Sequence, residues 1–308
     1  MANSVSSVHD GNRLTVSEII GQPTWIAERV IDNLDGAMIT DALYRDAGES
    51  SLAVSYREAA APYLDEDAED VAEFAEIPVA NLSLGEVNTL VAKKVAVGVR
   101  ISYEMRKFNQ LGMVERQIDA LQGTMVRSDV RNALAALGAA SVAATPASAP
   151  WSDSGSDPVG DIFDAIEAVQ AAHVDGDENA NFGYNPDTLI LHPAALTALT
   201  RNETVQRLYT GSAALENPLY KGQLPQTLFG LNVLPSRWAD PTRVIVAEAG
   251  AVGFRADAMP LEMTALYPEG GTEQHGGPNM SYRADAWRAR IVGVDGPKAA
   301  HIVTGVRA

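Results

Sequence analysis

The fold is decided by residues 87–137, which read VNTLVAKKVAVGVRISYEMRKFNQLGMVERQIDALQGTMVRSDVRNALAAL. The first part alternates with a period of two. From Val87 to Ile101 every odd-numbered residue is valine, threonine or isoleucine, except Lys93. β-Branched residues on one side of such an alternation predict a strand with one buried face. We therefore expect one long strand over residues 87–101, interrupted at Lys93.

The second part changes to the period of a helix. A continuous helix over residues 104–137 would be about 50 Å long at ~1.5 Å per residue. Gly112 costs roughly 1 kcal/mol relative to alanine inside a helix, so a break is expected near it. A helix of this length is an architectural element in a chain of 308 residues. Its apolar stripe, at spacings of three and four, consists of Leu111, Val114, Ile118, Leu121, Met125, Leu134 and Leu137.

On the N-terminal side, SLAVSYREAAAPYL (residues 51–64) is expected to pair antiparallel with this strand, forming a long hairpin that projects from the body. From Glu58 to Glu76 there are eight acidic residues and no basic one, so this connection cannot lie in a packed core. Two interpretations stay open, a solvated acidic loop and an arm that lies on a basic neighbour. The first 35 or so residues are expected to be a tethering arm with a little helix.

On the C-terminal side, GAASVAATPASAPWSDSGSDP (residues 138–158) is small, polar and proline-bearing, which predicts a linker and a domain boundary. Mixed helical and strand patterns follow and predict a compact α+β domain over residues 159–266. The glycine-rich stretch YPEGGTEQHGGPN (residues 267–279) then precedes two closing strands. The fold class expected for the whole chain is α+β.

The composition excludes several classes of protein. The chain has no cysteine, which rules out disulfides, thiolate catalysis and cysteine-based metal centres. Its net charge of −17 repels polyphosphate, and the pairs Lys93/Lys94 and Arg106/Lys107 are too small to overcome it. No apolar run approaches the ~20 residues of a membrane span, and the N-terminus lacks the pattern of a signal peptide. We expect no membrane partner.

Motifs for catalysis or metal binding are weak. The five histidines lie on separate predicted elements without ligand spacing. Residues 175–186 begin like a calcium loop, but Ala180 stands where glycine is needed and Pro186 where glutamate is needed. No glycine pattern matches a phosphate-binding loop. We therefore expect no catalytic residue, no cofactor and no metal, although a soluble enzyme of unknown type stays open as an alternative.

The order of the segments resembles the major capsid protein of tailed bacteriophages, which has the Hong Kong phage-type capsid fold also found in encapsulin shells. The resemblance begins near residue 36, and no single motif is diagnostic. Arginine outnumbers lysine 18 to 5, which is typical of a GC-rich genome and favours a phage of an actinobacterium. The similar stretches are SYREAAAPYL, AEFAEIPVANLSL, VAKKVAVGVRISYEM, TLILHPAALTALTRNETVQRLY, LFGLNVLPS, AVGFRADAMPLEM and YRADAWRARIVGVDGPKAAHIVTG.

The resemblance implies an organisation around an extended loop, a peripheral domain with a long spine helix, and an axial domain. The implied parts are an N-terminal arm and lead-in (1–49), the extended β-hairpin loop (50–92), the peripheral domain with the spine helix (93–158), the axial domain (159–266), and the peripheral loop with the closing strands (267–308).

It also implies a function without catalysis. The chain would assemble with itself into pentamers and hexamers of an icosahedral shell that encloses double-stranded phage DNA without sequence-specific binding. It would be found in the virion and assemble in the host cytoplasm. The other implied partners are a separate scaffolding protein, a portal and, as an open question, a decoration protein. An encapsulin-like nanocompartment is the alternative. Because no lysine precedes Lys93, crosslinking through a lysine of the loop is not expected.

The expected contacts between subunits fall into two groups. We expect the acidic stretch from Glu58 to Glu76 to dock on arginines of a neighbouring subunit, with Arg100, Arg106, Arg283, Arg288 and Arg290 as candidates. In the extended loop the expected contact residues are Tyr56, Arg57, Tyr63, Glu66, Glu69, Asp70, Phe74 and Glu76. In the peripheral domain they are Arg100, Arg106, Glu269, Glu273, His275, Arg283, Arg288 and Arg290.

Overall fold

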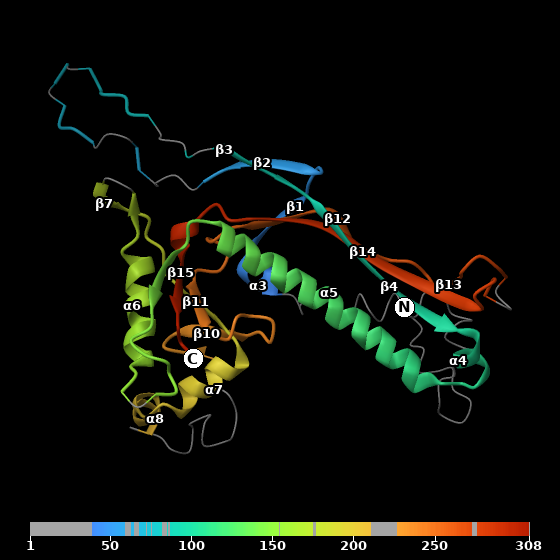
Figure 1. The fold of residues 1–308 in the computed structure, drawn as a ribbon. Coiled ribbons are helices and arrows are strands. Elements are labelled where there is room, and N and C mark those ends of the chain that lie inside the picture. The colour runs from blue at the N-terminus through green and yellow to red at the C-terminus, as the bar shows by residue number, and fades with distance from the viewer. Residues whose placement is uncertain are drawn as a thin grey trace.

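Two large sheets and one long helix organise the described part of the chain (Figure 1). The structure is a computed structural model. The first 35 or so residues, predicted as a tethering arm, lie outside the described residues, as do Glu66, Glu273 and His275 of the predicted contacts. The structure describes residues 39–307 except 59–62, 65–67, 72, 75, 82–84, 86, 154, 175–176, 211–226 and 273–275.

The predicted long helix is confirmed, together with its break. The strand β4 (Lys93–Ser102) leads into the short α4 (Tyr103–Lys107), and α5 (Leu111–Ala139) follows with 29 residues, about 43 Å. The Ser102 hydroxyl caps α4 by accepting from the Met105 amide. The break falls at residues 108–110, before Gly112, because Asn109 adopts a φ of +48° that a helix cannot continue through.

One face of α5 packs on a five-stranded sheet in the described ranges. Val114, Ile118, Leu121 and Met125 meet Tyr282 and the alanines of the longest strand in one core, so this part of the predicted apolar stripe faces the sheet. The end of the stripe, Leu134 and Leu137, belongs to another core that includes Ile39 and Leu43. The short α3 (Ile39–Leu43) packs against the C-terminal half of α5. The strands are β1 (Arg45–Glu49), β12 (Phe254–Met263), β14 (Ser281–Gly293) and β13 (Tyr267–Pro268), with β4 paired to β14.

The second large sheet has six strands in the described ranges and packs against helices α6 (Pro158–Gln170), α7 (Pro193–Arg201) and α8 (Glu203–Thr210). A small pair, β6 (His173–Val174) and β7 (Asp177–Asn181), and a 3₁₀ turn, η2 (Pro297–Ala299), complete the elements. In sheet order the strands are β5 (Ala143–Pro146), β15 (Ala300–Thr304), β11 (Arg243–Ala247), β8 (Thr188–Leu191), β10 (Leu231–Pro235) and β9 (Thr227–Leu228).

Three sequence predictions about this region need correction. The stretch 138–158 is more than a linker, because it contains β5 and the buried Trp151, whose Nε1 donates to Asp161 at 2.8 Å. Strand β12, predicted with the axial domain, pairs with β14 beside α5. Strand β15, predicted with the closing strands, lies between β5 and β11 in the other sheet. The two sheets therefore share strands across the predicted boundaries, and the five-part division stays a prediction.

The predicted hairpin is confirmed where the structure describes it, since β2 (Ala53–Arg57) pairs antiparallel with β3 (Val87–Val91). The single strand over 87–101 is wrong, because β3 pairs with β2 whereas β4 pairs with β14. In β3 the buried face is also the opposite of the predicted one. In β3 the side chains of Val87 and Val91 are exposed, and Leu90 is half-buried instead. The described residues between β2 and β3 lie away from the body (Figure 1).

Candidate assembly surfaces

The base of the projecting hairpin is fixed to the body by apolar packing. Tyr56 and Leu90 pack against Phe254 and Ile291 of the five-stranded sheet. The rings of Tyr56 and Phe254 meet edge to face, with centroids 5.3 Å apart and an interplanar angle of 68°. Burial raises the pKa of the Tyr56 hydroxyl. The hairpin therefore leaves the body in a direction that the core sets.

Past this base the described residues expose large apolar side chains. Phe74 is 99% exposed, Val79 84% and Ile77 75%. Phe74 lies in a turn at φ +67°, a region that glycine adopts easily and bulky residues rarely do. Exposed apolar side chains gathered on one segment mark an interaction site more often than an ordinary surface. The further exposed apolar residues of this segment are Tyr63, Leu64 and Val71.

The same segment carries acidic side chains without compensation. Glu69, Asp70, Glu73 and Glu76 are all exposed. None of them forms an ion pair with any other residue that the structure describes. We name residues 63–81, in their described part, the projecting segment. Within the described part of its own subunit, neither an apolar cover nor a positive charge lies against it.

A polar cluster lies where β4, β13 and β14 meet at one end of the five-stranded sheet. The Glu269 carboxylate accepts from Arg100 at 2.6 Å and from the Ser281 hydroxyl at 2.8 Å. These hydrogen bonds hold the pKa of Glu269 below its ordinary value, and the one from Arg100 has the largest effect. Asp285 accepts from Arg283 at 2.7 Å and from the Tyr267 hydroxyl at 2.6 Å. The glycine-rich loop after β13 is thus anchored at its base.

A buried charge network ties α5 to the same sheet and to α3. Arg290 donates to Asp257 at 2.7 Å and to Asp41 at 3.0 Å, and it approaches Asp129 of α5 at 3.4 Å. Arg288 lies 3.2 Å from Asp257 and 3.8 Å from Asp129. The Thr40 hydroxyl also donates to Asp129. The side chains of Arg290 and Asp129 are only 6% and 8% exposed, so their charges depend on one another.

Burial raises the pKa of Asp129, against the lowering effects of the Thr40 hydrogen bond and of Arg290. The folded protein therefore binds this proton more readily than the unfolded chain, and the contribution of Asp129 to stability grows as the pH falls through the window between the two pKa values.

We predict that the difference in the free energy of unfolding between the wild type and Asp129→Asn shifts in favour of the wild type as the pH is lowered from 7 to 4. Denaturant unfolding of both proteins across this range measures it, and parallel profiles would contradict it.

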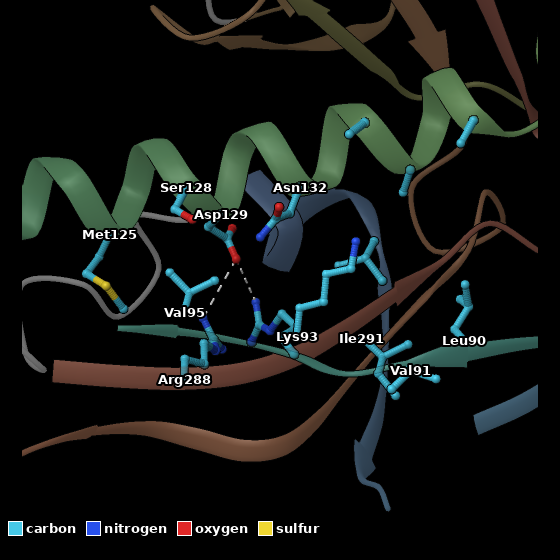
Figure 2. A pocket seen from close by; sticks show the side chains of 15 residues that line it. Leu90, Val91, Lys93, Val95, Met125, Ser128, Asp129, Asn132, Arg288 and Ile291 are labelled. Atoms are coloured by element: carbon cyan, nitrogen blue, oxygen red, sulfur yellow. Dashed lines mark hydrogen bonds and ion pairs between the residues drawn. The ribbon is translucent and has the colours of Figure 1, made fainter. Parts of the chain in front are cut away.

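A groove runs between α5 and strands β3 and β4 (Figure 2). It consists of a pocket of about 330 Å³ and an adjacent one of about 290 Å³, which share Val95, Met125, Ser128 and Asn132. We name it the α5 groove. Helix α5 lines the groove with small side chains, and positively charged side chains also line it. The small residues are Ser128, Ala135, Ala136 and Ala139, and the cations outside the buried network are Lys93, Arg127 and Arg131.

The predicted contact residues of the extended loop fall in two places. Tyr56 packs at the hairpin base and Arg57 is exposed at the end of β2. The exposed members on the projecting segment are Tyr63, Glu69, Asp70, Phe74 and Glu76. Their contact with another subunit stays a prediction.

The described members of the predicted peripheral-domain contacts have partners within the subunit, and their contact with another subunit stays a prediction. Arg100, Glu269 and Arg283 meet in the polar cluster, and Arg106 donates to the Tyr282 hydroxyl at 2.8 Å. Carboxylates of their own subunit pair with Arg288 and Arg290, whose side chains are 13% and 6% exposed, and docking of the acidic stretch on them stays a prediction.

Sequence reasoning missed the three aspartates that pair with these arginines. Asp41, Asp129 and Asp257 come from three separate elements, α3, α5 and β12. One signal was present, because Asp129 falls four residues after Met125 on the apolar stripe of the helix. A carboxylate at such a position requires a buried partner, but the sequence does not name it.

The described residues contain no group of three or more histidine, cysteine, aspartate or glutamate side chains that could hold a metal ion. None of the described helices has the length and apolar character needed to cross a membrane. In the buried network each aspartate faces an arginine. The prominent surfaces of this structure are the projecting segment, the polar cluster and the α5 groove.

Comparison with known proteins identifies solved structures of similar architecture. The structure is similar to the virus-like particle of Pyrococcus furiosus, with 12% identity, a TM-score of 0.56, and coverage of 90% of this chain and 97% of the other. It is similar to the capsid of Myoviridae phage XM1, with 14% identity, a TM-score of 0.53, and coverage of 98% and 96%. For Gordonia phage Cozz the identity is 16%, the TM-score 0.54, and the coverage 88% and 85%.

These likenesses confirm the α+β capsid fold that the order of segments predicts. No curated protein sequence matches the chain. Residues 86–303 match the family described as phage capsid protein. Because this match spans more than half of the 308 residues, the chain belongs to the phage capsid protein family.

Proposed function

We propose that this capsid protein is the major shell subunit of a tailed phage, forming pentamers and hexamers of an icosahedral shell around double-stranded DNA. The observation that carries the proposal is the projecting segment, which exposes Phe74, Ile77 and Val79 on a rigidly based hairpin. No described residue of the subunit covers this apolar surface, and in the proposed shell another subunit covers it. We propose no catalytic role for it.

Assembly would supply the missing burial. Apolar surface removed from water contributes about 25 cal/mol per Å², and a closed symmetric shell repeats each contact in every subunit. Contacts that are weak one at a time then add up to a stable container. The proposed mechanism thus uses the projecting segment as the part of the subunit that finds its partner.

Other partners follow from charge and from the family. A net charge of −17 disfavours a sequence-specific grip on DNA, so the DNA would be enclosed and not read. A separate scaffolding protein and a portal are proposed for assembly in the host cytoplasm, and a decoration protein stays an open addition. The protein would then reside in the virion. An actinobacterial host remains a prediction from the excess of arginine over lysine.

An encapsulin-like nanocompartment is the second candidate, because the fold is also similar to a virus-like particle from Pyrococcus furiosus. The two candidates share the shell and differ in the contents. Purified native particles that hold a protein cargo and no DNA would favour the nanocompartment.

Electron microscopy in negative stain tests the proposal directly. The purified protein, expressed alone and together with the scaffolding protein of the same phage, is expected to form rings or closed shells. Light scattering at high protein concentration measures the same assembly in solution. A strictly monomeric mass under both conditions would reject the shell function.

We also predict that mature shells are held together without covalent bonds between subunits. The first lysine of the chain is Lys93, so the loop before it offers no amine for an isopeptide bond. Boiling particles in detergent should release a single band near 32.7 kDa. A ladder of larger bands that survives boiling would contradict this prediction.

A further inference from the structure

A separate hollow of about 730 Å³ lies away from the α5 groove, in the part of the molecule that contains α7 and α8 (Figure 1). Three stretches that are distant in the sequence form its walls: the loop before α6, the corner between α7 and α8, and the chain after β15. We name it the α7–α8 pocket. Its volume falls in the range of small-molecule sites, about 300–1,000 Å³.

Hydrogen bonds hold the walls of this pocket to one another. The Trp151 amide donates to the Val306 carbonyl at 2.9 Å, which joins the loop before α6 to the chain after β15. The Asn202 side chain donates to the Ser156 hydroxyl at 3.0 Å and accepts from the Thr204 amide at 2.9 Å, which joins the same loop to the corner between α7 and α8. Trp151 and Ser156 are only 1% and 5% exposed. The shape of the pocket is therefore set by the folded subunit.

Three arginines from three elements line the pocket. Arg201 ends α7, Arg207 lies on α8, and Arg307 follows β15; all three are exposed. Arg207 pairs with Glu203 at 3.1 Å, whereas Arg201 and Arg307 form no ion pair with any residue that the structure describes. The carboxylates in the lining are Glu203 and Asp153. Three arginines and two carboxylates leave a net positive lining in a chain of net charge −17, which favours an anion.

The set of charged groups narrows the class of anion. Guanidinium groups bind phosphate and carboxylate oxygens through paired hydrogen bonds. A phosphate monoester has three terminal oxygens, so each of three arginines can contact one, whereas a carboxylate has two. An ionised Asp153 accepts hydrogen bonds and repels an anion, so it suits hydroxyl groups of the ligand. The pocket is also larger than a phosphate ion alone requires. A phosphate ester with a small hydroxylated body fits all three conditions.

We propose that the α7–α8 pocket binds a small sugar phosphate, with Arg201, Arg207 and Arg307 on the phosphate group and Asp153 accepting from hydroxyl groups of the sugar. This inference goes beyond the proposed shell function and does not depend on it. The bound phosphate would join α7 and α8 to the chain after β15, because arginines of all three would share it. A ligand that binds only the folded protein stabilises it, so the thermal midpoint of the subunit should rise with ligand concentration.

Isothermal titration calorimetry of the purified full-length protein with ribose 5-phosphate tests the site. Arg201→Gln with Arg307→Gln is expected to bind at least ~10-fold more weakly than the wild type, because two charge-assisted contacts are lost. The matched control is Arg116→Gln with Arg131→Gln. These two arginines are exposed on α5 and lie outside the lining of the pocket, and their replacement makes the same change in net charge. The control should bind like the wild type.

Two ligand controls on the wild type keep the test decisive even if a variant fails to fold. Ribose lacks the phosphate and inorganic phosphate lacks the sugar, so each should bind at least ~10-fold more weakly than ribose 5-phosphate. The proposal is overturned if the wild type does not bind ribose 5-phosphate, if inorganic phosphate binds as tightly, or if the two double variants bind equally. Because binding is measured on the unassembled subunit, such a failure leaves the shell function untouched, and a failure to form shells leaves the pocket untouched.

Discussion

Replacing residues 58–86 by Thr-Asn-Gly-Lys is expected to abolish shell formation and leave the subunit folded. The register pairs Arg57 with Val87. The four new residues extend this ladder by one pair and close it with an Asn-Gly turn, the favoured two-residue hairpin connection. The hairpin base stays intact, because Tyr56 and Leu90 keep their packing against Phe254. Only the part of the loop beyond the base is lost.

Two measurements decide this prediction. The circular dichroism and thermal midpoint of the shortened subunit should match those of the wild type, whereas electron microscopy should show no closed particles. A variant with the native loop length and Tyr63→Ser controls for the loss of one exposed apolar side chain alone. Closed particles of normal size from the shortened chain would show that the projecting segment is dispensable and that assembly depends on other surfaces.

Arg290→Leu is expected to lower the free energy of unfolding by about 3–5 kcal/mol, because removing one partner leaves buried charges uncompensated. Arg290 approaches Asp41, Asp129 and Asp257, and its own side chain is 6% exposed. Arg288 alone then faces the carboxylates of α5 and β12. Loss of the network should also loosen α3 and α5 from the sheet, since these aspartates lie on separate elements.

Denaturant unfolding of the unassembled subunit measures this effect. Arg243→Leu is the matched control, because Arg243 pairs with Asp240 at 3.6 Å and both side chains are about half exposed. An exposed pair contributes roughly 0–1 kcal/mol, so the control should remain close to the wild type. Equal stability losses in the two variants would contradict the view that burial of the network matters.

The sequence by itself determined the features that arise from local periodicity and composition. Alternation over residues 95–101 predicts β4 with its buried side correctly, and spacings of three and four predict α5. The run of carboxylates from Glu58 to Glu76 identifies a segment outside the core. These signals are local because the strand and helix periods repeat within one element. The order of such elements was enough to indicate the capsid fold.

Only the tertiary structure decided which elements meet. The same alternation that works for β4 fails in β3, because β3 changes partner to β2 and packs Leu90 on Phe254. Strands β5 and β15 pair with each other although more than 150 residues separate them in the sequence. Arg290 was expected on an interface, but aspartates on three distant elements enclose it. The alternation of a strand indicates that one of its faces is buried. It does not identify the surface that covers this face, since that surface comes from residues remote in the chain.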